Sequence, residues 1–124
     1  MNLIDSFGWI KYFAEGPLAK RYAQYVESAT TENTVTPTTV IFEVYRRLKA
    51  RKGGQRALEA YAQMTETKIV ALDEDLALAA ADVSLQMGLG MGDAIILASA
   101  RRFRAQILTG DRHFEKIPEA KLIH

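Results

Sequence analysis

The sequence predicts an α/β fold with a short, mainly parallel sheet that helices cover on both faces. Short apolar runs of strand type alternate with longer segments whose apolar residues recur at helical spacing. Strands that alternate with helices along a chain form parallel sheets flanked by helices. The chain has 124 residues, of which 48% are hydrophobic and 25% are charged. We therefore expect residues 1–124 to form a single domain with its own core.

The first half of the chain is predicted to contain two strands and four helices. In order, these are a strand at 3–4, helices at 6–13 and 18–29, a strand at 34–36, and helices at 37–52 and 55–65. Ser6 is a suitable N-cap for the first helix, which the following Gly16-Pro17 pair ends. Pro37 suits the start of the third helix. Gly53-Gly54 separates the third helix from the fourth.

The second half is predicted to contain three strands and two helices. In order, these are a strand at 68–71, helices at 74–88 and 93–103, and strands at 106–109 and 121–123. Asp73 is a suitable N-cap for the first of these helices, which ends near Gly88. Asp93 opens the second helix, where the helix dipole favours a carboxylate.

Four acidic residues each stand where an apolar run stops or a helix begins: Asp5, Glu43, Asp93 and Asp111. Two of them, Asp5 and Asp111, follow predicted strands, and sites in parallel sheets lie at the carboxyl ends of strands. At about 4 Å and an effective dielectric constant near 20, each pair of carboxylates repels by roughly 4 kcal/mol. Such a cluster is stable when a cation binds it, so we predict a site for Mg²⁺ or Mn²⁺.

The chemistry of a divalent ion suggests the type of reaction. It lowers the pKa of a bound water and polarises a phosphoryl oxygen. The reaction class that this suggests is hydrolysis of a phosphodiester by an activated water. No P-loop is present, because residues 88–92 lack the Lys-Ser/Thr of that motif. The absence of cysteine excludes disulfides, thiolate nucleophiles and cysteine-ligated metals.

Each acidic residue also has a purely structural interpretation. The aspartates are suitable helix caps or turn residues. Glu43 could form an ion pair along its helix with Arg46 or Arg47. His113 is interpreted as a loop residue or a hydrogen-bond partner rather than a catalytic base. A further group is assigned to helix starts and surface positions outside the site, namely Asp73, Glu74, Asp75 and Asp82.

The net charge of +1 gives no global preference for nucleic acid, so any such preference must come from local patches. A dense basic run ends the predicted helix 37–52: Arg46, Arg47, Lys49, Arg51 and Lys52. It either complements the helix dipole or contacts an RNA backbone, and Arg46, Arg47 and Lys49 are the candidate RNA contacts. The basic groups at 101, 102 and 104 have the same two interpretations. Aromatic residues in the first half are assigned to the core, with a protein interface as the alternative.

Taken together, the acidic motifs resemble those of PIN-domain ribonucleases, specifically the VapC-like toxins of type II toxin–antitoxin pairs. The matching segments are Ile4-Asp5-Ser6, Phe42-Glu43-Val44, Gly92-Asp93-Ala94-Ile95-Ile96 and Leu108-Thr109-Gly110-Asp111. Their order and spacing match over almost the whole chain. Many relatives carry a further acid two residues after the last aspartate, where this chain has His113.

The resemblance implies a three-layer α/β/α PIN-like domain with metal-dependent endoribonuclease activity on RNA. It implies that Asp5 and Asp93 are the main Mg²⁺ (or Mn²⁺) ligands and that Glu43 and Asp111 complete the catalytic pocket. Thr109, and with it Ser6, is expected to shape that pocket. The resemblance further implies a homodimer and a cognate VapB-like antitoxin that inserts a segment into the active-site groove.

Two other functions are compatible with the sequence. A receiver-like phosphoacceptor module shares a small α/β fold and an acidic metal pocket, and a catalytically silent PIN-like domain would only bind partners. We expect a cytoplasmic protein without membrane association, since cysteines are absent and no apolar run is long enough to span a bilayer. Asp5 also stands where a signal peptide would carry its positive charge.

Overall fold

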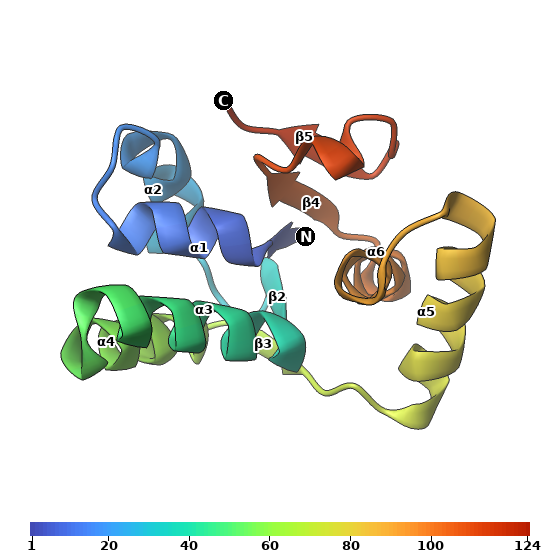
Figure 1. Cartoon of the computed structure of the whole chain (residues 1–124), viewed down its shortest axis with the longest axis horizontal. Helices are drawn as coiled ribbons and strands as arrows, with labels where there is room; N and C mark the ends of the chain where they lie inside the picture. The colour runs from blue at the N-terminus through green and yellow to red at the C-terminus, as the bar shows by residue number, and fades with distance from the viewer.

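The computed structural model describes residues 1–124 and contains one five-stranded parallel sheet with helices on both faces (Figure 1). The strand order is β3-β2-β1-β4-β5, and every pairing is parallel. The strands are β1 (Asn2–Ile4), β2 (Thr34–Pro37), β3 (Lys68–Val70), β4 (Gln106–Thr109) and β5 (Ala120–Leu122). The predicted α/β class with a short parallel sheet is confirmed.

The helices form two layers, one on each side of the sheet (Figure 1). One layer contains α1 (Ser6–Phe13), α2 (Ala19–Glu27), α3 (Thr38–Lys52) and α4 (Gly54–Met64). The other contains α5 (Glu74–Met87) and α6 (Met91–Phe103). A parallel sheet needs cover on both faces because its strands are apolar on both sides. Accordingly, Leu3 and Ile4, which point to opposite faces, are both fully buried.

Helix α6 lies between the sheet and α5 and is buried almost all round. Residues 94–100 are all buried, including the hydroxyl of Ser99, which donates to the Ile95 carbonyl at 2.7 Å. A helix that is apolar on every side needs packing partners on every side, and here the sheet and α5 supply them. This packing holds the N-terminus of α6 in one place.

Helix starts agree with the prediction to within two residues, but the cap of α1 and the position of Asp93 in α6 differ from it. The N-cap of α1 is Asp5 rather than Ser6, because Ser6 is already helical while Asp5 is extended and accepts from the Gly8 amide at 3.2 Å. Helix α6 begins at Met91 after Gly90, so Asp93 lies in its first turn. The predicted cap of α5 is confirmed, since Asp73 accepts from the Leu76 amide at 2.8 Å.

The structure also corrects which helical residues face the core. Leu58 in α4 and Leu85 in α5 are large apolar residues at helical spacing from other apolar residues, but they are 57% and 86% exposed. Alanines face inward instead, at Ala57 and Ala60 in α4 and at Ala80 in α5. Small residues at these positions let neighbouring helices approach closely, and the large apolar side chains remain on the surface.

The chain order creates a switch point between β1 and β4. From β1 the chain proceeds to β2 and β3 on one side, and then returns to place β4 on the other side of β1. Ligand sites of open parallel sheets lie outside the carboxyl ends of strands at such a point. Helix α3 follows β2 and helix α6 leads into β4, so both helices have their N-terminal ends at this same edge.

No single helix is long and apolar enough to cross a membrane; α5 and α6 would meet the criteria of length and composition only together, with a bend of 112° between them.

Candidate metal centre

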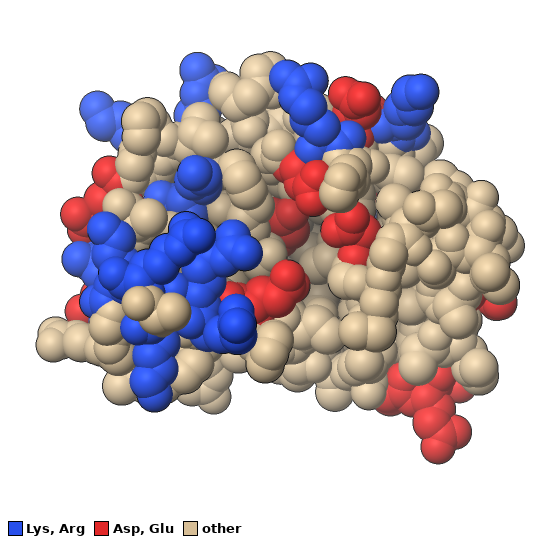
Figure 2. Space-filling view, in the orientation of Figure 1, with Lys and Arg blue, Asp and Glu red and all other residues tan.

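A cleft of about 550 Å³ opens at the carboxyl edge of the sheet, and the four predicted acids line it. Asp5 follows β1, Glu43 lies in α3, Asp93 lies in the first turn of α6, and Asp111 follows β4. Figure 2 shows acidic side chains gathered in a hollow near the centre of this face. Ser6 lines the same cleft. Residues spread over the whole sequence therefore meet in one place.

Asp5 lies at the bottom of this arrangement and is only 6% exposed. Burial raises the pKa of Asp5 to about 7, although hydrogen bonds from Thr109 and Gly8 favour its charged form. The negative charges of Asp111 and Glu43 raise this pKa further. The Asp5 carboxylate is thus held beside other acids in a position where charge is disfavoured without a cation.

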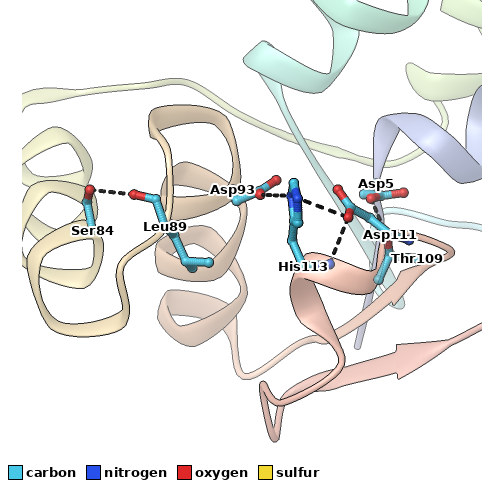
Figure 3. Close-up of polar contacts among 7 residues, drawn as sticks. All are labelled: Asp5, Ser84, Leu89, Asp93, Thr109, Asp111 and His113. Carbon is cyan, nitrogen blue, oxygen red and sulfur yellow. Dashed lines mark hydrogen bonds and ion pairs between the residues drawn. The ribbon is translucent and has the colours of Figure 1, made fainter.

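Thr109 connects the ends of the neighbouring strands β1 and β4 (Figure 3). Its hydroxyl donates to Asp5 Oδ2 at 2.5 Å and accepts from the Asp111 backbone amide at 3.0 Å. The Thr109 side chain is fully buried, and its bond to Asp5 forms away from solvent. Thr109 therefore orients Asp5 and holds the turn that carries Asp111.

Glu43 and Asp93 line the same cleft and influence each other's charge. The pKa of Glu43 is raised by burial and by the charge of Asp93, and it is lowered by Arg47. Burial and the charge of Asp111 raise the pKa of Asp93, while His113 lowers it. Arg46 and Arg47 form no ion pair, so the helical ion pair considered for Glu43 is absent.

Asp111 caps a 3-10 turn, η1 (Arg112–Phe114), that sequence patterns did not predict. Its carboxylate accepts from the His113 backbone amide at 2.8 Å. The ring nitrogen His113 Nδ1 lies 3.2 Å from Asp93 Oδ2 and 3.4 Å from Asp111 Oδ1 (Figure 3). The interpretation of His113 as a hydrogen-bond partner is confirmed.

The donor set fits a hard divalent cation. Carboxylate oxygens from four acids surround the cleft, and donor atoms of Asp93, Asp111 and His113 lie within 4.8 Å of one another. Burial, and then the charges of neighbouring carboxylates, raise the pKa values of Asp5, Glu43 and Asp93, so positive charge in the cleft would favour their ionised forms. A bound Mg²⁺ or Mn²⁺ would supply that charge.

The basic residues fall into two groups. Arg46 and Arg47 line the acidic cleft, and Lys49 lines a neighbouring groove. Figure 2 shows a large group of basic side chains to the left of the acidic hollow, and smaller groups along the top of this face. By contrast, Arg101 pairs with Glu119 and Arg102 pairs with Asp73, so these two arginines have structural partners.

Sequence patterns did not explain Phe7 or Gly110. A Cβ atom at Gly110 would lie 2.3 Å from Phe7 Cε1, so the absence of a side chain at 110 lets the Phe7 ring lie against the turn after β4. Phe7 also lines the acidic cleft. The glycine between Thr109 and Asp111 was the available signal for such a close approach.

The chain resembles known proteins both in sequence and in structure. The sequence model of the PIN domain matches residues 3–120. A comparison with curated protein sequences gives no significant match.

Solved structures resemble the chain along its whole length. A toxin–antitoxin complex from Klebsiella pneumoniae has a TM-score of 0.81 at 24% identity, and the alignment covers 100% of this chain and 98% of that one. The sarcin–ricin loop cleaving toxin VapC20 of Mycobacterium tuberculosis has a TM-score of 0.76 at 18% identity, covering 96% and 98%. DNA-bound VapBC from Salmonella typhimurium has a TM-score of 0.71 at 14% identity, covering 98% and 97%. At these identities the likeness establishes the fold.

Proposed function

Because the chain belongs to the PIN-domain family, we propose that it is a metal-dependent endoribonuclease that acts as the toxin of a toxin–antitoxin pair. The observation that carries this proposal is the convergence of Asp5, Glu43, Asp93 and Asp111 on one cleft. The full-length likeness to VapC toxins supports the toxin assignment. In this proposal, residues 1–124 form a single PIN-like domain that carries the whole site.

Asp5 and Asp93 are the main ligands of a Mg²⁺ or Mn²⁺ ion in the proposed site, and Glu43 and Asp111 complete the pocket. When bound, the ion supplies activation of water and neutralisation of charge on the phosphodiester. Thr109 keeps the Asp5 carboxylate oriented through its 2.5 Å hydrogen bond. Ser6 lines the cleft beside Asp5 and shapes its floor.

RNA is the proposed substrate, and Arg46 and Arg47 are its proposed phosphate contacts. Both side chains line the cleft and neither forms an ion pair, so their charge is available to a phosphate backbone. Their position beside the acids would hold a phosphodiester next to the ion site. The description of VapC20 as a toxin that cleaves the sarcin–ricin loop supports an RNA substrate.

A VapB-like antitoxin is the proposed protein partner. An apolar groove of about 670 Å³ lies between α3 and α4 and is lined by Ile41, Phe42, Tyr45, Leu58 and Tyr61, among others. It shares Phe42 and Arg46 with the acidic cleft, so one bound segment would reach both. The toxin–antitoxin complexes among the similar structures support this partner. Failure of the product of a short adjacent reading frame to bind or inhibit this chain would argue against it.

A homodimer is proposed through the opposite layer. Large apolar side chains are exposed on α5 and at the start of α6: Leu78, Leu85, Met87 and Met91. Leu78 and Leu85 lie seven residues apart and therefore share the outer face of α5, and exposed apolar residues that share a face are typical of interfaces. Sedimentation of the purified chain at a monomer mass across micromolar concentrations would remove this part of the proposal.

The nuclease proposal is tested by cleavage of total RNA with Mg²⁺, with Mn²⁺ and with EDTA. D5N and D93N keep the side-chain shape but remove charge, and each should reduce metal-dependent cleavage by at least about a hundredfold. D82N is the matched control, since Asp82 is exposed and does not line the cleft. Full cleavage by either D5N or D93N would contradict the assignment.

The alternatives predict other results. A catalytically silent domain would bind neither Mg²⁺ nor Mn²⁺ in a calorimetric titration of folded protein. A receiver-like module would form a stable aspartyl phosphate from a phosphodonor, but membership of the PIN-domain family does not support it.

A further inference from the structure

His113 lies on the rim of the acidic cleft with its ring turned inward. The side chain is 73% exposed, so core packing does not determine its orientation. Both polar contacts of its ring are with cleft carboxylates, at 3.2 Å to Asp93 and 3.4 Å to Asp111 (Figure 3). The 3-10 turn holds its backbone, because the His113 amide donates to Asp111 at 2.8 Å. The imidazole is thus directed at two acids by local structure.

The two separations from His113 Nδ1 to the carboxylates are close to those between neighbouring ligands of an octahedral ion. Ligand atoms about 2.1 Å from an ion, at right angles to one another, lie about 3 Å apart. The measured separations of 3.2 and 3.4 Å approach this value without rearrangement of the backbone. Because the side chain is 73% exposed, water and a phosphate would be able to approach a site beside the ring.

We propose that His113 Nδ1 is a further direct ligand of the proposed ion, on the side of the site formed by Asp93 and Asp111, and that this nitrogen makes the site prefer Mn²⁺ to Mg²⁺. Magnesium favours oxygen ligands and retains its waters, whereas imidazole nitrogen suits transition metals. Replacing a carboxylate by a neutral imidazole also removes one negative charge, which weakens binding of the harder ion more. This inference rests on the proposed metal-dependent nuclease and specifies the ion that it uses.

Electron spin-echo spectroscopy of bound Mn²⁺ tests the ligand directly, because a coordinated imidazole ¹⁴N couples to the electron spin. The chain has two histidines, so the assignment needs only H113N and the matched control H124N, both without an affinity tag. Wild type and H124N should show the nitrogen coupling, and H113N should lose it. Labelling with ¹⁵N-histidine should change the coupling in H124N, where His113 is the only source.

Metal affinities measured by calorimetry give an independent readout that does not depend on RNA cleavage. The ratio of the Mg²⁺ Kd to the Mn²⁺ Kd should fall about tenfold in H113D, because the variant offers oxygen in place of nitrogen. H124N should keep the wild-type ratio. Circular dichroism verifies that each variant is folded, and the exposure of both positions favours this.

The outcomes separate the two proposals. Mn²⁺ binding without nitrogen coupling, or coupling that persists in H113N, would overturn the role of His113 and leave the metal-dependent nuclease intact. An unchanged affinity ratio in H113D would overturn the proposed preference for Mn²⁺. Absence of Mn²⁺ and Mg²⁺ binding together with absence of RNA cleavage would overturn the nuclease proposal itself.

Discussion

The hydroxyl of Thr109 donates a 2.5 Å hydrogen bond to Asp5, a residue 104 positions earlier in the chain. The contact forms because β1 and β4 are neighbours, with Ile4 paired to Leu108, so the residues that follow them lie side by side. It links the two halves of the acidic cleft through a single buried side chain. The behaviour of the cleft should therefore depend on this hydroxyl.

T109V removes the hydroxyl while keeping the shape of the side chain. Asp5 Oδ2 and the Asp111 amide then lose their partner, which should lower the free energy of unfolding by about 1–3 kcal/mol and weaken Mn²⁺ binding. T109S is the control, because it keeps the hydroxyl. Denaturant unfolding and calorimetry give the two readouts, and equal values for T109V and T109S would show that the hydroxyl is unimportant.

The raised pKa of Asp5 predicts how stability varies with pH in the metal-free protein. Between the unfolded pKa near 3.8 and the folded pKa of about 7, the folded state binds more protons than the unfolded state. Protonated Asp5 therefore contributes its full stabilisation below the unfolded pKa. That stabilisation is lost as the pH rises through the folded pKa of about 7. The loss is at most on the order of 4 kcal/mol, and the raised pKa values of Glu43 and Asp93 act in the same direction.

Denaturant unfolding in EDTA at pH 5, 6, 7 and 8 measures this effect. D5N should flatten the profile, because an amide does not titrate. Saturating Mn²⁺ should reverse the trend, since the ion binds the charged carboxylates. A wild-type protein that gains stability from pH 5 to pH 8 in EDTA would contradict the prediction.

Gly110 is predicted to be required for the close approach of Phe7. G110A places a Cβ atom 2.3 Å from Phe7 Cε1, which should destabilise the fold by about 1–3 kcal/mol through displacement of the ring. The loss should be smaller in an F7A background, because the clashing ring is absent. G16A is the control, since a Cβ at Gly16 meets nothing within 4 Å. Equal losses in both backgrounds would exclude this contact as the cause.

Arg46 and Arg47 are predicted to contact the RNA backbone. R46Q/R47Q should weaken binding of single-stranded RNA in EDTA and reduce the slope of log K against log salt by about 1.4, or about 0.7 for each contact. R51Q/K52Q removes the same charge from the same helix at exposed positions that do not line the cleft. Fluorescence anisotropy at several salt concentrations gives the slopes. Equal slopes for the two double variants would indicate that only net charge matters.

The tertiary structure explains why part of this site was predictable and part was not. The four acids were recognisable because each stands beside an apolar run, and the order of strands and helices followed from local periodicity. The orientation of His113 was not predictable from the sequence, because it depends on η1 and on Asp93 of α6. Likewise, Leu58 and Leu85 stand at helical spacing from other apolar residues, yet their side chains are exposed. The spacing of apolar residues could not show that alanines occupy the buried positions of these helices.

By itself the sequence determined the α/β class, the alternation of elements and the caps and breaks at Asp73, Gly53 and Gly88. These features depend on backbone preferences and on contacts between residues a few positions apart, so the local sequence is enough to predict them. Only the tertiary structure decided that Asp5 meets Thr109, that Asp93 meets His113, and that Arg46 lines the cleft. Those contacts depend on the placement of β1 beside β4 and on the packing of α6 between the sheet and α5, which the whole chain must determine together.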